Sequence, residues 1–133
     1  MNGDAGNDII TVDIVTRQFP DPVGTTVIAV NGGTGDDTIT GAQHNGWYWA
    51  ASREHCILGA EWGDDVIYRF DDETDSEGGD DFLVFGGGSG PQDFEALTVT
   101  QGSGFILVAF GENSVILHGM NTSSFTAADV LFI

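Results

Sequence analysis

The chain has 133 residues, 21 of them acidic and only three of them lysine or arginine, so its formal net charge is -18. A chain this acidic repels nucleic acid and anionic membranes, which excludes both as partners and favours cations. Its hydrophobic fraction of 41% comes in short runs between glycines, which predicts one folded domain rather than disorder. Cys56 is the single cysteine, so no intrachain disulfide can hold the fold together.

In chain order, strand-forming residues come in short bursts separated by turns that carry glycine or proline. We expect strands at residues 9–12, 25–30, 38–40, 66–70 and 82–85. No stretch of this part has a helical period, so an all-β fold is expected. Apolar positions expected to point inward recur mostly every 9 to 11 residues, at Ile10, Phe19, Ile28, Ile39, Tyr48, Ile57, Ile67 and Leu83.

The tail has a different pattern. Two apolar runs, at residues 105–110 and 114–117, flank Gly111, Glu112 and Asn113, which predicts a β-hairpin with a three-residue turn. Residues 124–129 predict one helical turn capped by Ser124 or Thr126. Residues 130–133 predict a final apolar strand packed on the hairpin.

A short phrase recurs at four of the turns: glycine, then Asn or Asp, then aspartate, any residue, and Ile or Leu. Residues 32–40 extend it to the nonapeptide G-G-x-G-x-D-x-U-x without a mismatch, and residues 3–11 do so with one. Glycine allows a loop tight enough to turn backbone carbonyls toward one point, and the aspartate adds a charged oxygen there. Because calcium takes six to eight oxygens, two stacked loops are needed to surround it.

On these residues the chain resembles the RTX, or hemolysin-type calcium-binding, repeat family. The resemblance implies an all-β fold: a parallel β-roll of nine-residue half-turns closed by a C-terminal hairpin and strand. It divides the chain into a calcium-binding roll at residues 1–99 and a cap at residues 100–133. It also implies Ca²⁺ as cofactor, an extracellular location, and a module that folds on calcium binding and supports type I secretion of a larger exported protein.

The two ends of the chain fit that resemblance. Glycine and aspartate follow Met1 at once, so we expect no N-terminal signal peptide and a place at the C-terminal end of a longer protein. The ending from Asp129 to Ile133, an acid followed by apolar residues, resembles the signal read by a type I secretion ABC transporter. No apolar run is long enough to span a bilayer, so no membrane insertion is expected.

The candidate metal-site residues are the glycines and aspartates of the loops. Alternate half-turns of a roll share an edge, so we expect Asp65 to pair with Asp81, 16 residues further on (81 − 65). Asp37 would share a site near Glu54 or Thr16, and Asp8 would face the weakened loop at Thr26 or a neighbour outside the chain. The full candidate set is Gly6, Asp8, Gly33, Gly35, Asp37, Gly63, Asp65, Gly79 and Asp81, with a second pair, Asp75 and Asp93.

Two other functions stay open. Trp47, Trp49 and Trp62 either fill a core where the repeat has decayed or form an exposed platform that stacks on a polysaccharide. A small enzyme could use the acidic residues, but no H-E-x-x-H, G-x-S-x-G or C-x-x-C pattern occurs. His55 and Cys56 are adjacent and would point to opposite faces of a strand, so they cannot act as base and nucleophile. We expect no catalytic activity.

Overall fold

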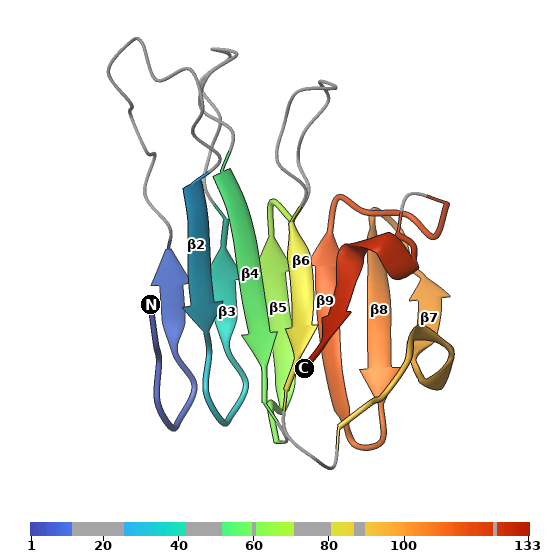
Figure 1. Cartoon of the computed structure of the whole chain (residues 1–133). Helices are drawn as coiled ribbons and strands as arrows, with labels where there is room; N and C mark the ends of the chain where they lie inside the picture. Colours follow the sequence, from blue (N-terminus) through green and yellow to red (C-terminus); the bar gives the residue numbers. More distant parts are fainter. Residues whose placement is uncertain (12–25, 42–51, 60, 71–80, 87–89, 124) are drawn as a thin grey trace, which may run out of the picture.

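The chain forms two β-sheets that pack face to face around one core (Figure 1). The computed structural model describes residues 1–11, 26–41, 52–59, 61–70, 81–86, 90–123 and 125–133, without the side chains of 26–28 and 52–54. From β1 to β6 the chain alternates between the two sheets, so it winds as a coil and each turn adds one strand to each sheet. This confirms the predicted all-β fold, a parallel β-roll.

The larger sheet has six strands in the order β1-β3-β5-β9-β8-β7. Pairing is parallel from β1 to β9 and antiparallel from β9 to β7. Its strands are β1 Ile9–Thr11, β3 Thr38–Thr40, β5 Asp64–Tyr68, β9 Asn113–His118, β8 Phe105–Phe110 and β7 Thr98–Gln101.

The smaller sheet has four strands in the order β10-β6-β4-β2, all parallel. Its strands are β10 Val130–Phe132, β6 Phe82–Phe85, β4 Ser52–Leu58 and β2 Thr26–Asn31. In Figure 1 these strands lie in front of β1, β3, β5 and β9 and run in the opposite direction to β1, β3 and β5.

The core lies between the sheets and is filled by apolar rows that run across the strands. In the larger sheet Ile39, Ile67 and Leu117 are in register, and none is more than 1% exposed. In the smaller sheet Cys56 and Leu83 are in register and buried. Side chains alternate across a strand, so each rung sends one apolar side chain inward, and burying an Ile or Leu contributes about 1.5–3 kcal/mol.

Each full turn of the roll is longer than the roughly 18 residues that two of the predicted nine-residue half-turns would give. Asp8 and Asp37 are neighbours across the sheet although 29 residues separate them, and Asp37 and Asp65 are neighbours at a separation of 28. The expectation for Ile57 was wrong by one residue: Cys56 and Leu58 are buried, while Ile57 lies on the other face of β4 and is only partly buried. The expected positions Phe19 and Tyr48, and the side chain of Ile28, lie outside the described part.

The tail forms the predicted elements with two corrections. Phe110 pairs with Asn113, so the β8–β9 hairpin turns on two residues rather than three, and Gly111 has a φ of 62°. Strand β10 does not join the hairpin but pairs with β6 in the smaller sheet. The helical turn is a 3₁₀ helix, η2 (Ala127–Asp129), with Thr126 as its N-cap as predicted, while Ser124 lies outside the described part.

Three elements were not predicted: strand β4, strand β7 and a 3₁₀ helix, η1 (Phe94–Ala96). The predicted boundary after residue 99 falls inside β7, in a sheet that continues from the roll into the tail. Neither described helix is long and apolar enough to cross a membrane.

Candidate metal centre

Three acidic loops meet at one edge of the roll. They comprise residues 3–8, 32–37 and 61–65 and lead into β1, β3 and β5, and we call them the acidic edge. Figure 1 shows the first two side by side below β1 and β3. Parallel pairing of the three strands brings their loops together although they are far apart in sequence.

An inner ladder of hydrogen bonds joins the aspartates that end each loop. The backbone N–H of Asp8 donates to Oδ1 of Asp37 at 2.8 Å, and the N–H of Asp37 donates to Oδ1 of Asp65 at 2.9 Å. The exposed fraction of the Asp37 side chain is 1% and that of Asp65 is 2%. Three carboxylates are therefore held in a row, two of them almost fully buried.

An outer ladder runs parallel to it through the preceding residues. The N–H of Asp36 donates to Oδ1 of Asn7 at 3.1 Å, and the N–H of Asp64 donates to Oδ1 of Asp36 at 3.0 Å. The hydroxyl of Ser114 then donates to Oδ1 of Asp64 at 2.8 Å. These exposed groups fix the spacing of the loops, and Ser114 ends the row on β9.

Glycine is required where one loop rests on the next. Gly35 has a φ of 118° and Gly63 a φ of 82°, which side chains rarely adopt. A Cβ at Gly35 would collide with the carbonyl oxygen of Gly6, and a Cβ at Gly63 would collide with that of Gly35. Gly33, at φ 106°, meets the carbonyl of Asp4 in the same way. The glycines thus let backbone carbonyls approach the neighbouring loop.

Two carboxylate oxygens of the inner ladder are buried without a hydrogen-bond partner: Oδ2 of Asp8 and Oδ2 of Asp37. A Cβ at Gly3 would press against the first, and one at Gly32 would collide with the second, so each oxygen turns back over its own loop. A buried ionised oxygen without a partner costs several kcal/mol. Native proteins avoid that cost by pairing such a group or by coordinating a metal.

The charge at this edge is unfavourable without a cation. Burial raises the pKa of Asp65 from 3.8 to about 7. The N–H of Asp37 opposes this rise, whereas the negative charges of Asp37, Asp36 and Asp64 add to it. At neutral pH Asp65 is therefore poised between its protonated and ionised forms, and a nearby cation would favour the ionised form.

The donor set fits a hard cation. Carboxylate and carbonyl oxygens in flexible loops are the ligands that Ca²⁺ takes. Within the described residues no three His, Cys, Asp or Glu side chains gather around one point. Side chains alone would therefore not complete a site here, and carbonyls such as those of Gly6 and Gly35 would have to supply the remaining oxygens.

The structure corrects the predicted pairing of Asp65 with Asp81. Asp65 lies at the start of β5 in the larger sheet, whereas Asp81 is buried just before β6 in the smaller sheet. Since β5 and β6 run in opposite directions, their starts lie at opposite ends of the roll (Figure 1). Asp65 is next to Asp37 instead, and Asp37 is next to Asp8.

The other candidates fall outside the acidic edge or outside the described part. Asp93 is the exposed N-cap of η1, where its Oδ1 accepts the N–H of Ala96 at 2.9 Å. Asp75 and Gly79 lie outside the described residues, as do Thr16 and the side chain of Glu54. Gly6, Asp8, Gly33, Gly35, Asp37, Gly63 and Asp65 all lie on the acidic edge.

The reading of Trp62 as part of an exposed platform is wrong. Its side chain is 1% exposed and packs against Phe85 with the ring centroids 5.3 Å apart. Its indole N–H donates to the carbonyl of Ser114 at 3.3 Å, which ties the third acidic loop to β9. Trp62 is a core residue, and Trp47 and Trp49 lie outside the described residues.

Sequence reasoning missed the residues that end the ladders on β9. Asn113 accepts the N–H of Gly63 through its Oδ1 at 3.0 Å, and Val115 stands opposite Asp65. In the observed register Ser114, Val115, Ile116 and Leu117 stand opposite Asp64, Asp65, Val66 and Ile67. The glycine and aspartate phrase does not recur before β9, so the loop motif gave no signal for these partners.

Comparison with known proteins supports the fold. No protein-family model and no curated protein matches the sequence. Among solved structures, the chain is similar to the extracellular lipase LipA from Serratia marcescens, with a TM-score of 0.55 and 20% identity. The match covers 96% of this chain and 20% of the lipase, so the chain spans about one fifth of that protein's length.

Proposed function

We propose that the chain is a calcium-binding β-roll module that folds when calcium fills the acidic edge. The observation that carries the proposal is the pair of buried carboxylate oxygens without a partner, Oδ2 of Asp8 and Oδ2 of Asp37. Each one turns back over a glycine loop, which is where a cation would meet backbone carbonyls as well. The net charge of -18 favours the binding of cations over the whole surface as well.

The residues of the edge would couple cation binding to folding. Like charges about 4 Å apart repel by roughly 4 kcal/mol at an effective dielectric of 20, so the ladder of aspartates opposes the stacking of the loops. A bound calcium ion supplies positive charge and offsets this repulsion. Ligands that bind only the folded chain stabilise it, by about 2.7 kcal/mol at one hundred times their Kd.

We further propose that the module works outside the cell, as the end of a larger exported protein that a type I secretion ABC transporter recognises through Asp129 to Ile133. The fold similarity to one fifth of an extracellular lipase supports a role as one part of a larger protein. Extracellular calcium sites fill at about 10⁻⁴ to 10⁻³ M, so the chain would stay open where calcium is scarce and fold after export. The proposal assigns no catalytic role to the chain.

The test is a calcium titration of the purified chain, followed by circular dichroism and calorimetry. Millimolar calcium should convert a disordered spectrum into a β spectrum, with magnesium a poor substitute because it requires a smaller octahedral site. Asp37→Asn should weaken calcium binding at least about tenfold, since it removes a buried charge. Asp36→Asn makes the same charge change at an exposed neighbour and serves as the matched control. Identical spectra and melting temperatures in calcium and in chelator would reject the proposal.

A further inference from the structure

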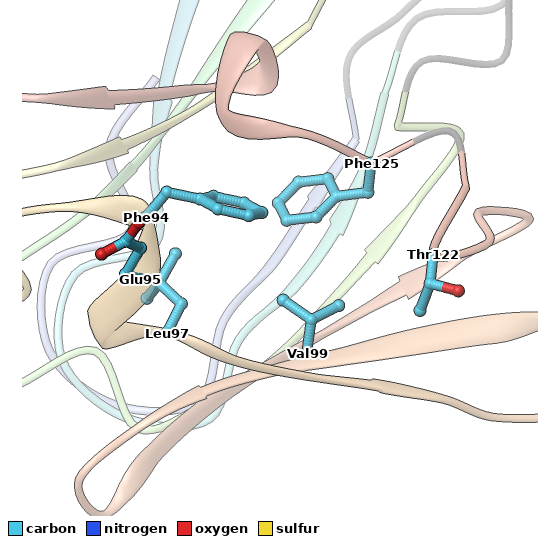
Figure 2. Close-up of a pocket in the computed structure, with 6 residues that line it drawn as sticks. All are labelled: Phe94, Glu95, Leu97, Val99, Thr122 and Phe125. Carbon is cyan, nitrogen blue, oxygen red and sulfur yellow. The ribbon is translucent and has the colours of Figure 1, made fainter.

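At the edge of the larger sheet opposite β1, a pocket lined by four apolar and two polar residues opens beside the edge strand β7. It has a volume of about 430 Å³ and is lined by Phe94, Glu95, Leu97, Val99, Thr122 and Phe125. Figure 2 shows Phe94 and Phe125 facing each other on one side, with Leu97 and Val99 on the other. A volume of this size is within the range that accommodates ligands.

The backbone of β7 is open along the same side. Strand β7 stands last in its sheet, and β8 is its one partner among the strands that the structure describes. The N–H of Gly102 donates to the carbonyl of Phe105, so alternate residues Thr100 and Thr98 face β8. The N–H and C=O groups of Val99 and Gln101 therefore point away from the sheet and can accept another strand.

Val99 belongs both to the pocket and to the open edge of β7. Its side chain lines the pocket while its backbone groups point outward. A strand added to β7 would run about 4.8 Å away, and the side chains on its inner face would lie beside those of Leu97 and Val99. One apolar side chain of that strand would then enter the pocket against Phe94 and Phe125.

The surrounding charge selects the partner. Glu95 and Asp93 are exposed beside the pocket, and the chain carries a net charge of -18 without a single lysine. An acidic peptide would be repelled, as would a second copy of this chain. We infer that β7 and its pocket bind an extended, basic peptide segment of a partner protein by strand addition, with one apolar side chain as anchor.

The probe is a seven-residue peptide with blocked ends that alternates lysine with valine or leucine, added to the full chain in millimolar calcium and 0.15 M salt. Three control peptides separate strand addition from charge: one has the lysines replaced by glutamate, one has the same composition in two blocks, and one is N-methylated on two neighbouring central residues. We expect the alternating peptide to bind and each control to bind at least about tenfold more weakly. Amide exchange at Val99 and Gln101 should slow in the complex.

Two variants test the edge itself. Val99→Pro removes an outward N–H without removing a bond to β8, because proline is tolerated where the N–H faces solvent. We expect it to weaken peptide binding about tenfold, whereas Val99→Ala, which keeps the N–H, should weaken it only a few-fold. Equal binding of the alternating and N-methylated peptides, or unchanged exchange at Val99, would overturn the inference and indicate charge attraction alone. A dimer seen by sedimentation without peptide would overturn it too, with a second copy as the occupant.

Discussion

Asp37 and Asp65 are joined by a hydrogen bond from the N–H of Asp37 to Oδ1 of Asp65, although 28 residues separate them and both are buried. The bond satisfies one oxygen of Asp65 but brings two carboxylates together in the interior. Oδ2 of Asp37 meanwhile has no partner. The fold therefore concentrates negative charge at a buried point, which has a physical rationale if a cation occupies the acidic edge.

The first prediction concerns pH. The pKa of Asp65 is about 7 in the folded chain against 3.8 as its ordinary value, so the folded chain holds this proton more tightly than the unfolded chain. Without metal, the folded form should therefore lose stability as the pH rises from about 4 to 7, by at most a few kcal/mol. In chelator, the β signal in circular dichroism should therefore be larger at pH 5.5 than at pH 8.

Calcium should reverse part of this dependence, because protons compete with the cation for the ionised carboxylate. Calcium affinity should rise over the same pH interval and level off above it. Asp65→Asn should flatten the dependence in chelator, while Asp64→Asn, which removes only one of the weaker causes of the raised pKa, should reduce it only slightly. A β signal in chelator that grows as the pH rises would contradict the assignment.

The second prediction ranks the aspartates. Asp37 lies between Asp8 and Asp65, so its carboxylate can serve both neighbouring loops, whereas Asp8 has one described neighbour. Calorimetry should show the largest loss of calcium affinity for Asp37→Asn, at least about tenfold, and a smaller loss for Asp8→Asn. Asp81→Asn should not affect binding at this edge. An equal loss of calcium affinity in Asp65→Asn and Asp81→Asn would instead support a site shared by Asp65 and Asp81, which the topology contradicts.

The third prediction separates backbone strain from close approach. Gly6 and Gly35 both have a φ of 118°, so alanine is strained at either position. Beyond that strain, a Cβ at Gly35 collides with the carbonyl of Gly6, while one at Gly6 meets nothing within 4 Å. Gly35→Ala should therefore cost about 1–3 kcal/mol more than Gly6→Ala in thermal or urea unfolding. Equal losses would mean that the loops can move apart freely.

The sequence predicted which residues form the acidic edge but not which of its aspartates lie next to each other. The glycine and aspartate phrase identified Asp8, Asp37 and Asp65, because it marks the loops that stack on one another at this edge. Their pairing depends on the length of each turn, and the described turns take 28 or 29 residues where the repeat suggests about 18. The additional residues of each turn carry no such phrase, so nothing local revealed which rungs would meet.

The sequence also failed to predict which face of β4 is buried and which sheet β10 joins, because both depend on long-range pairing. Cys56 is buried and Ile57 is not, because a strand alternates strictly and a shift of one residue exchanges its faces. The apolar run 130–133 was predictable as a strand, but its pairing with β6 is a long-range choice. The capping box of Thr126 and Asp129 is local, and it was predictable at Thr126.

The last prediction concerns strand β10. Val130 pairs with Leu83 and is 5% exposed, and Phe132 stacks on Phe85 at 5.8 Å, so β10 covers the edge of β6 and part of the core. Leu131 is 38% exposed on the same strand. Val130→Ser should therefore cost about 1–3 kcal/mol of unfolding free energy in calcium, and Leu131→Ser less than about 0.5 kcal/mol.

Deletion of residues 130–133 extends this test to export. The shortened chain exposes the edge of β6 and should aggregate or stay disordered even in calcium. In cells with a matching type I exporter, the deletion should also block release of a fused cargo, whereas Val130→Ser should destabilise the roll but preserve export, because the chain leaves unfolded. A shortened chain that folds normally but is not exported would mean that residues 130–133 act only as an export signal. A shortened chain that is still exported would remove the secretory role and leave β10 as the structural edge of the smaller sheet.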